Sequence, residues 1–251
     1  NNLFGWWQTL AVADVNGDGL QDLILGNIGE NCYIHPDPTH PVKLWLNDFD
    51  ENNVSDRILT STIDGKDMPV FLKHDMEDQI PGLKKKSLKH KDYATKTIQE
   101  LFTPDIIKSC VVKQFNYPAS IIAINEGNGK FRIQKLPMEL QLSSVNAIHS
   151  TDLNGDGKPD LIMGGNEYGF LPQFERLDAS NGSVLLNMGK GEFQLLSNDA
   201  SGVDLNGQIR DIQEIKTEKG KELLFLRNDM YPVLFRLSSA TPKPSTKTAG
   251  K

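Results

Sequence analysis

The 251-residue sequence predicts a mainly β fold built from small repeated sheets. Three observations lead to this prediction. A nine-residue polar pattern occurs three times, short apolar runs that end in glycine follow two of its copies, and glycine-rich turns lie between pairs of apolar runs. Repeated units of strand, polar loop, strand and hairpin are typical of a β-propeller, complete or partial, or of a similar array of small sheets.

The nine-residue pattern places oxygen-bearing side chains at positions 1, 3, 5 and 9 of residues 14–22, 48–56 and 152–160. Glycine at positions 4 and 6 of the first and third copies permits a sharp turn. The middle copy lacks both glycines and has the neutral Asn52 at position 5. We expect each loop to surround a cation with these four side chains and the carbonyl of position 7. The expected ligands are Asp14, Asn16, Asp18, Leu20 and Asp22; Asp48, Asp50, Asn52, Val54 and Asp56; and Asp152, Asn154, Asp156, Lys158 and Asp160.

The donor set of these loops favours a hard cation. All ligands are oxygens, and neither cysteine nor histidine is present in the loops to favour zinc or copper. Calcium accepts about six to eight oxygens, whereas magnesium keeps more of its water, so we expect up to three calcium ions. An EF-hand or a dockerin loop would need an acid at position 12. Leu25, Leu59 and Met163 stand there, which excludes both.

The segments after the loops predict strands and hairpins. The apolar runs 23–26 and 161–165 end in glycine and are too short for helices, so they predict buried strands. Residues 125–131 and 187–193 are glycine-rich turns that follow apolar runs. They predict hairpins, because glycine adopts the positive φ angle that tight turns require.

Residues 66–110 interrupt this theme, and we expect an α-helical insertion there. Apolar residues recur at helical spacing near its end, and a proline follows where a helix should stop. These residues are Ala94, Ile98, Leu101, Phe102 and Pro104.

A further polar segment, residues 201–211, resembles a loop that has lost its ligands. Counted from Asp204, positions 5 and 9 are Gln208 and Ile212, which predicts a blade without metal. The organisation expected for the whole chain then takes four parts. These are a blade region with two calcium loops at 1–65, the insertion at 66–110, a blade region with one calcium loop and the degenerate loop at 111–237, and a flexible tail at 238–251.

Composition and charge exclude several classes of protein. The formal net charge is −6, which argues against a protein that coats nucleic acid or an anionic membrane. No apolar run is long enough to predict a transmembrane segment. Cys32 and Cys110 are too few for a disulfide scaffold or a zinc site, and one bridge or two thiols are equally compatible with the sequence.

The loop pattern resembles the FG-GAP or VCBS repeats of integrin-α-like β-propellers, and the resemblance covers about residues 3–237. Further short motifs resemble VCBS-repeat proteins of Bacteroidota that are related to the cartilage-acidic-protein (ASPIC/UnbV-type) group. These motifs are Gly5-Trp6-Trp7, residues 47–50, Tyr93-Ala94, Leu136-Pro137, Gly164-Gly165-Asn166 with Tyr168, and Arg227-Asn228. The resemblance implies a secreted or outer-membrane surface protein and a chain that is part of a larger protein. At about 40–50 residues per blade, roughly four blades are expected. That is few for a closed ring, so other blades or another chain would complete it.

The function expected from these features is that of a non-enzymatic, calcium-stabilised interaction or scaffold module at the bacterial cell surface. Its partner would be a protein or the remaining propeller blades, or the chain would be a subunit of an outer-membrane complex. No catalytic residue is singled out. A carbohydrate-binding or polysaccharide-cleaving protein on a calcium propeller is the alternative, in which a glycan would be the ligand.

Overall fold

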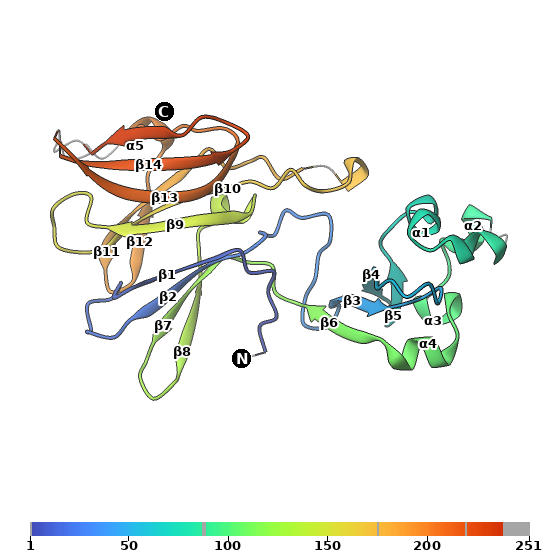
Figure 1. The fold of residues 1–251 in the computed structure, drawn as a ribbon. Helices are drawn as coiled ribbons and strands as arrows, with labels where there is room; N and C mark the ends of the chain where they lie inside the picture. Colours follow the sequence, from blue (N-terminus) through green and yellow to red (C-terminus); the bar gives the residue numbers. More distant parts are fainter. Residues whose placement is uncertain (1, 87–88, 175, 219, 238–251) are drawn as a thin grey trace, which may run out of the picture. The chain divides into compact units, whose positions relative to one another are not determined.

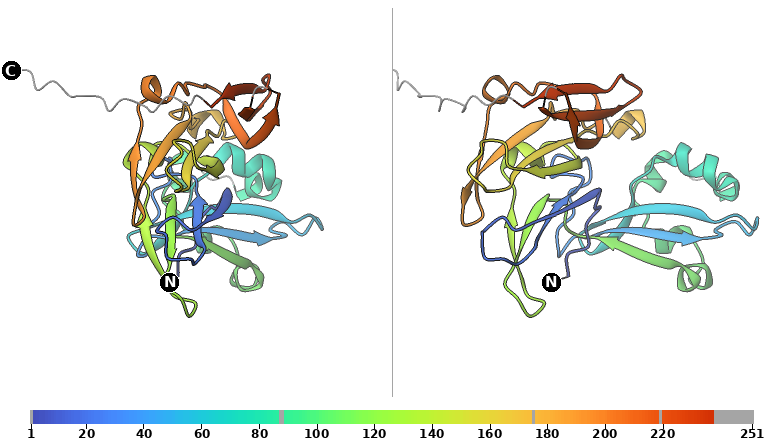
Figure 2. Two further views of the ribbon diagram at one scale, coloured as in Figure 1. Left: turned by 90° about the vertical axis from the view of Figure 1, so that its left-hand side faces the viewer. Right: turned by 60° about the vertical axis from the view of Figure 1, so that its left-hand side comes forward.

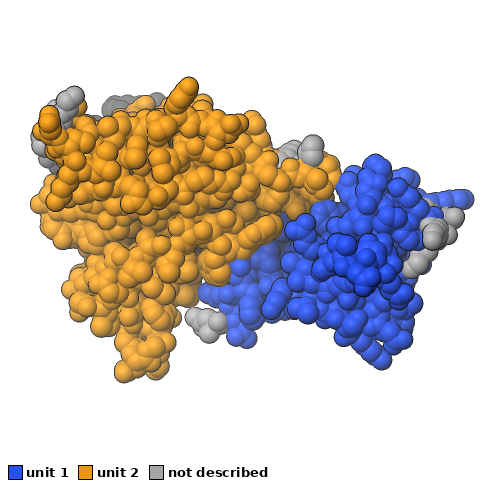
Figure 3. Space-filling view, viewed as in Figure 1, with its two compact units in different colours: residues 1–5, 34–118 blue, residues 6–33, 119–251 orange. Residues whose placement is uncertain are grey.

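A computed structural model describes residues 2–86, 89–174, 176–218 and 220–237, so the expected tail at 238–251 lies outside the described residues. The chain divides into two compact units (Figure 3). Unit 1 comprises residues 1–5 and 34–118, and unit 2 comprises residues 6–33 and 119–251. The interruption of unit 2 therefore runs from 34 to 118, which is longer than the expected insertion at 66–110 and includes one of the three loops.

Unit 2 contains three antiparallel sheets, which we call blades 1, 2 and 3 (Figure 1). Blade 1 has the order β1 (Thr9–Ala13), β2 (Asp22–Gly26), β7 (Ile121–Asn125) and β8 (Phe131–Lys135). Blade 2 has the order β9 (Val145–Thr151), β10 (Asp160–Gly165), β11 (Ser183–Gly189) and β12 (Glu192–Leu195). Blade 3 has the order β13 (Gln208–Thr217), β14 (Gly220–Asn228) and β15 (Val233–Arg236). The short helices of this unit are η2 (Met138–Gln141), η3 (Pro172–Phe174) and α5 (Asn198–Ser201).

The three blades follow one another, with blade 2 in the middle (Figures 1 and 2). Strand β9 contacts β1 on one side and β13 on the other. Apolar residues from blades 1 and 2 form one core cluster, which includes Ile24, Ile122 and Leu161. Residues from blades 2 and 3 form a second cluster around Ile162 and Phe225. Each interface between neighbouring blades thus has its own buried core.

The predictions for this part of the chain are confirmed where they concern fold class. The structure is mainly β, the apolar runs after the first and third loops are β2 and β10, and both glycine-rich turns join hairpin strands. Segment 201–211 leads into β13. Because β13 ends at Thr217 and β14 begins at Gly220, no nine-residue loop fits between these two strands.

Unit 1 has a four-stranded antiparallel sheet of its own. Its order is β5 (Lys66–Pro69), β4 (Asp56–Ile63), β3 (Val42–Asn47) and β6 (Val111–Phe115). Its helices are α1 (Lys73–Gln79), η1 (Pro81–Lys86), α2 (His90–Tyr93), α3 (Ile98–Leu101) and α4 (Pro104–Ser109). Side chains from sheet and helices share one core, in which Trp45, Ile58, Met76 and Ile98 are buried.

The helical part of unit 1 is more broken than the apolar spacing predicts. Ala94 is exposed, and Thr97 starts a new helix, because its hydroxyl accepts from the backbone N–H of Glu100 while the Glu100 carboxylate accepts from the N–H of Thr97. This capping box separates α2 from α3. Pro104 occupies the first turn of α4 instead of merely ending a helix.

Both cysteines are free thiols. Cys32 is buried and Cys110 is half-buried. The alternative of two thiols therefore holds.

Candidate metal centres

The three polar loops occupy equivalent places in three sheets. Each connects two neighbouring antiparallel strands: β1 and β2, β3 and β4, or β9 and β10. In every case position 1 directly follows a strand and position 9 is the first residue of the next strand. Local sequence thus produces the same strand–loop–strand unit in blade 1, in blade 2 and in unit 1.

The position-9 aspartates close their loops from inside. Asp22, Asp56 and Asp160 are buried, and one carboxylate oxygen of each accepts from the backbone N–H of position 2. These bonds come from Val15 to Asp22 at 2.9 Å, from Phe49 to Asp56 at 3.1 Å and from Leu153 to Asp160 at 2.9 Å. Burial raises the pKa of Asp56 and of Asp160, because the charged form loses water that backbone N–H groups only partly replace.

The position-1 aspartates organise the turns. Asp14 accepts from the backbone N–H groups of Gly17, Asp18 and Gly19. These bonds, that of Gly19 first, lower the pKa of the Asp14 carboxyl. Asp152 accepts from Gly155 at 2.7 Å and from Gly157 at 2.9 Å in the same way, and Asp48 accepts from Asn52 and Asn53 at 2.9 and 2.7 Å.

The middle loop adopts this turn without glycine. Positions 4 and 6 have positive φ in all three loops, and in the middle loop these positions are Glu51 (φ 60°) and Asn53 (φ 65°). A side chain in the left-handed region costs about 1–2 kcal/mol per residue. Hydrogen bonds from Asn52 and Asn53 to the Asp48 carboxylate hold the loop in this backbone conformation.

The middle loop is also where three acids converge. Asp48, Asp50 and Asp56 each offer an oxygen, and these oxygens lie within 4.8 Å of one another. The Oδ1 atom of Asp50 is buried and has no hydrogen-bond partner among the described residues. This arrangement fits a hard divalent cation. Such an ion would offset the repulsion among the three carboxylates and would give the unpartnered oxygen a ligand bond.

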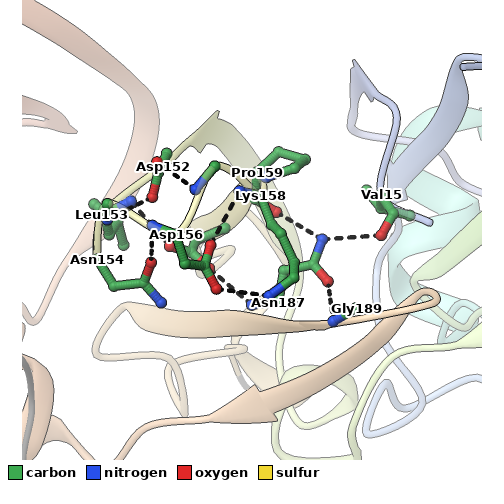
Figure 4. Close-up of polar contacts among 12 residues, drawn as sticks. Val15, Asp152, Leu153, Asn154, Asp156, Lys158, Pro159, Asn187 and Gly189 are labelled. Atoms are coloured by element: carbon green, nitrogen blue, oxygen red, sulfur yellow. Dashed lines mark hydrogen bonds and ion pairs between the residues drawn. The ribbon is translucent and has the colours of Figure 1, made fainter. Parts of the chain in front are cut away.

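In the other two loops the acids interact with neighbouring side chains instead of converging. In the first loop the Asn16 amide donates to the Asp18 carboxylate at 2.9 Å. In the third loop the Lys158 ammonium donates to Asp156 Oδ2 at 2.8 Å (Figure 4). This ion pair is the main cause that lowers the pKa of Asp156. Among the described residues, the convergence of three acids is found in the middle loop and not in these two.

Two asparagines that the sequence pattern treats only as parts of hairpins anchor the loops of blades 1 and 2. The backbone N–H groups of Asn125 and Asn187 each donate at 2.7 Å to the second carboxylate oxygen of Asp22 and Asp160, respectively. The Asn187 side chain donates to Pro159 O at 3.1 Å and also to Val15 O at 2.9 Å, which ties the loop of blade 1 to blade 2 (Figure 4). The recurrence of asparagine at the same place in both hairpins is the signal that could have revealed this role.

Comparison with known proteins identifies two segments. The model of the FG-GAP repeat matches residues 6–40 and 144–186. The matched segments contain the loops of blades 1 and 2, and the middle loop at 48–56 lies outside them. Neither the curated proteins nor the solved structures yield a match. Within the described ranges, no helix is long and apolar enough to cross a membrane.

Proposed function

We propose, from the premise that residues 6–40 and 144–186 are FG-GAP repeats, that this chain is a calcium-stabilised, non-enzymatic interaction module of a secreted or outer-membrane surface protein. The observation that carries the proposal is the recurrence of one oxygen-lined loop between neighbouring strands of three sheets. Its strongest form is the middle loop, in which Asp50 Oδ1 is buried and meets no hydrogen-bond partner in the described part of the chain.

The proposed ligands are the side chains at positions 1, 3, 5 and 9 of each loop, with the carbonyls of Leu20, Val54 and Lys158. A bound calcium ion would supply positive charge between carboxylates that otherwise repel one another. Positions 1 and 9 lie at the ends of two neighbouring strands, so ligation at both would fasten these strands together. In the third loop the Lys158 ammonium would have to leave Asp156. Both side chains of this salt bridge are partly exposed, so solvent weakens it.

The proposed location follows from the loop type. Extracellular calcium modules bind with dissociation constants of about 10⁻⁴–10⁻³ M, and binding to the native state stabilises it by mass action. Calcium at such concentrations is present outside cells, which supports a surface or secreted protein. FG-GAP repeats are generally interaction modules without catalysis, which supports a protein partner as the target.

Calcium titration of the metal-stripped chain tests the proposal. We expect heat of binding at up to three sites by calorimetry and a higher melting temperature with calcium, reversed by EGTA. Asp50→Asn should remove one site, because it deletes a charge from the only convergent acid cluster of the described residues. Asp64→Asn is the matched control in the same unit, since Asp64 is exposed and has a positive φ that asparagine tolerates. No heat and an unchanged melting temperature would contradict the proposal.

Carbohydrate binding is the second candidate, and an aromatic group in unit 2 favours it. Tyr33 stacks on Phe174 with ring centroids 4.2 Å apart and meets Phe170 edge-on at 5.2 Å. Trp6 meets Phe170 edge-on at 6.1 Å and is 39% exposed. Exposed aromatic faces bind the apolar faces of sugars, so a glycan array should show binding that Trp6→Ala abolishes. Tyr231→Ala, at an exposed site outside the aromatic group, is the control, and an assay for unsaturated products would detect cleavage.

A further inference from the structure

We propose that the lysine-rich part of unit 1 binds an anionic polysaccharide, a glycan chain that carries sulfate or carboxylate groups. The site, which we call the basic surface, consists of Lys84 on η1 and of Lys89, His90 and Lys91 at the beginning of α2. It uses no ligand of the three polar loops and no member of the aromatic group in unit 2. The proposal therefore goes beyond the function proposed above and can fail separately from it.

The charge of this segment is opposite to that of the chain. Residues 84–96 contain six lysines and one aspartate, which gives a formal charge of +5. Because the whole chain carries −6, the other residues together carry −11. A dense cationic segment in an acidic protein concentrates positive potential in one place, and lysine runs of this length are typical of patches that bind polyanions.

The fold presents this charge to solvent. Leu83 on η1 is 4% exposed and Tyr93 on α2 is 8% exposed, and both belong to the core cluster of unit 1. The Tyr93 hydroxyl also donates to Phe71 O at 2.9 Å. These residues anchor η1 and α2 to the unit, whereas all four side chains of the basic surface are exposed.

Ion pairs within unit 1 neutralise little of this charge. Lys84 lies 3.4 Å from the Asp78 carboxylate, and more than half of each side chain is exposed. Such a pair is weak, so an anionic ligand can replace it. Lys89 and Lys91 form no ion pair with any residue that the structure describes. The ammonium groups are therefore available to an external anion.

The type of cation favours a polysaccharide over a nucleic acid. The basic surface contains lysine and histidine but no arginine, so it lacks the planar guanidinium that reads base edges in pairs of hydrogen bonds. Tyr93, the aromatic residue of α2, is buried and offers no face on which bases could stack. Ammonium groups act as point charges, which suits sulfate and carboxylate groups along a sugar chain.

The position of the apolar residues disfavours a lipid surface. Helices that lie on membranes insert an apolar face below the headgroups. The large apolar residues described on η1 and α2, Leu83 and Tyr93, are instead buried in the core of unit 1. An anionic membrane would also repel the negative charge of the remaining chain. A flexible glycan chain can contact the basic surface alone.

The middle loop lies next to the helix that carries Lys84. A Cβ atom at Gly82 on η1 would lie 3.7 Å from the Cβ of Asp50, and Phe49 of the loop shares the core cluster with Leu83. The acids of a calcium-free loop would repel an anionic glycan, and a bound calcium ion would offset that repulsion. We therefore expect calcium to strengthen glycan binding, and this one expectation rests on the proposed function.

Two variants with equal net charge test the proposal. The first replaces the three lysines of the basic surface by glutamine, as K84Q/K89Q/K91Q. The matched control makes the same replacement at three exposed lysines of unit 1 outside the basic surface, as K66Q/K108Q/K113Q. Circular dichroism verifies that both variants keep the fold. Binding of dextran sulfate, hyaluronate and uncharged dextran to the full chain is then measured by biolayer interferometry, with calcium and with EGTA.

We expect the parent to bind at least one of the two anionic glycans and not dextran. K84Q/K89Q/K91Q should bind about tenfold or more weakly, because each lysine near an anionic surface contributes roughly fivefold in affinity. The control should stay within about twofold of the parent, because salt screens charges outside the contact.

Three results would overturn the proposal: equal weakening in both variants, binding of dextran, or binding of neither anionic glycan. Tighter binding of single-stranded DNA, or of vesicles that contain phosphatidylglycerol, would assign the basic surface to that class of ligand instead. Glycan binding that depends on the three lysines but not on calcium would support the basic surface and count against calcium in the middle loop.

Discussion

His149 on β9 has a buried Nε2 atom without a hydrogen-bond partner among the described residues. Loss of water on burial lowers the pKa of its imidazole, and the Lys221 ammonium adds to this effect. The carboxylates of Glu214 and Asp211 act in the opposite direction but do not outweigh burial. The side chain is therefore held in its neutral form next to blade 3, and protonation must work against the fold.

This environment predicts an acid-sensitive stability. The unfolded chain binds a proton near the ordinary histidine pKa of 6.5, which the folded chain resists. The contribution to the unfolding free energy is thus complete above pH 6.5 and is lost as the pH falls below that value. The unfolding free energy, measured with urea at constant calcium, should fall less between pH 7.5 and pH 5.5 for His149→Gln than for the parent protein. His74→Gln, at an exposed site in unit 1, should keep the parent's difference; equal behaviour of both variants would contradict this account.

Single residues also mark the limit of what the pattern predicts about the metal centres. The alternation of aspartate and asparagine located all three loops, and the apolar runs at 23–26 and 161–165 predicted the strands that follow the first and the third. By this pattern the middle loop departs most from the other two, because glycine is absent there and position 5 is neutral. The structure instead brings three acids together in that loop, with Glu51 and Asn53 taking the backbone conformation of glycine. The sequence shows where glycine makes a turn easy to form. Whether other residues adopt the same strained backbone depends on the tertiary structure that holds them there.

At the scale of elements, glycine sets how closely the blades approach. A Cβ atom at Gly26, the last residue of β2, would lie 2.2 Å from the carbonyl oxygen of Val145, the first residue of β9. The equivalent Gly164 of β10 faces Ile209 at the start of β13, with the nearest side-chain atom at 2.7 Å. The end of β2 thus packs against the start of β9, and the end of β10 packs against the start of β13. Glycine is required at both contacts, because a Cβ atom would clash with the next blade.

Gly26→Ala should therefore destabilise unit 2 by about 3 kcal/mol, because the oxygen it would meet belongs to the backbone and cannot rotate away. Chemical denaturation measures the change. Gly169→Ala is the control, since its Cβ would meet only the mobile carboxylate end of Glu167, and we expect a change within about 0.5 kcal/mol. A loss at Gly26 no larger than that at Gly169 would show that the blades can separate without penalty.

Strands and hairpins could be predicted from sequence because their signals are local. The apolar runs after the first and third loops end in glycine. The hairpin turns contain glycine at positive φ, as at Gly127 and Gly191. The helices of unit 1 were predicted less well. Apolar spacing alone does not reveal that Thr97 and Glu100 cap a new helix, although both residues carry the signature of a capping box.

At the scale of the molecule, the boundary of unit 1 could not be found from local pattern. The middle loop has the same chemistry as the other two, so the sequence places it in a propeller blade. Its assignment to a separate unit depends on β2 pairing with β7 and not with β3. Such pairing between distant segments leaves no periodic trace in the residues between them.

The structure predicts that unit 2 folds without residues 34–118. The chain segments on either side of residues 34–118 are hydrogen-bonded to each other. The backbone N–H of Asn27 donates to Ser120 Oγ at 2.9 Å, and its side-chain amide donates to Ala119 O at 3.2 Å. Unit 1 and unit 2 also have separate core clusters. A chain in which a short glycine–serine linker replaces 34–118 should unfold cooperatively in urea and bind one calcium ion fewer than the parent. An unfolded product by circular dichroism would contradict this prediction.

The insertion also fixes an order of events during synthesis. Leu23 of β2 pairs with Ala123 of β7, 100 positions later in the chain. The ribosome must therefore release all of unit 1 before the first blade can be completed, and the early hairpin of β1 and β2 waits with apolar side chains uncovered. Unit 1 can fold in that interval around its own core. Among the three blades, blade 1 is accordingly the one whose first hairpin needs protection by a chaperone while unit 1 is being synthesised.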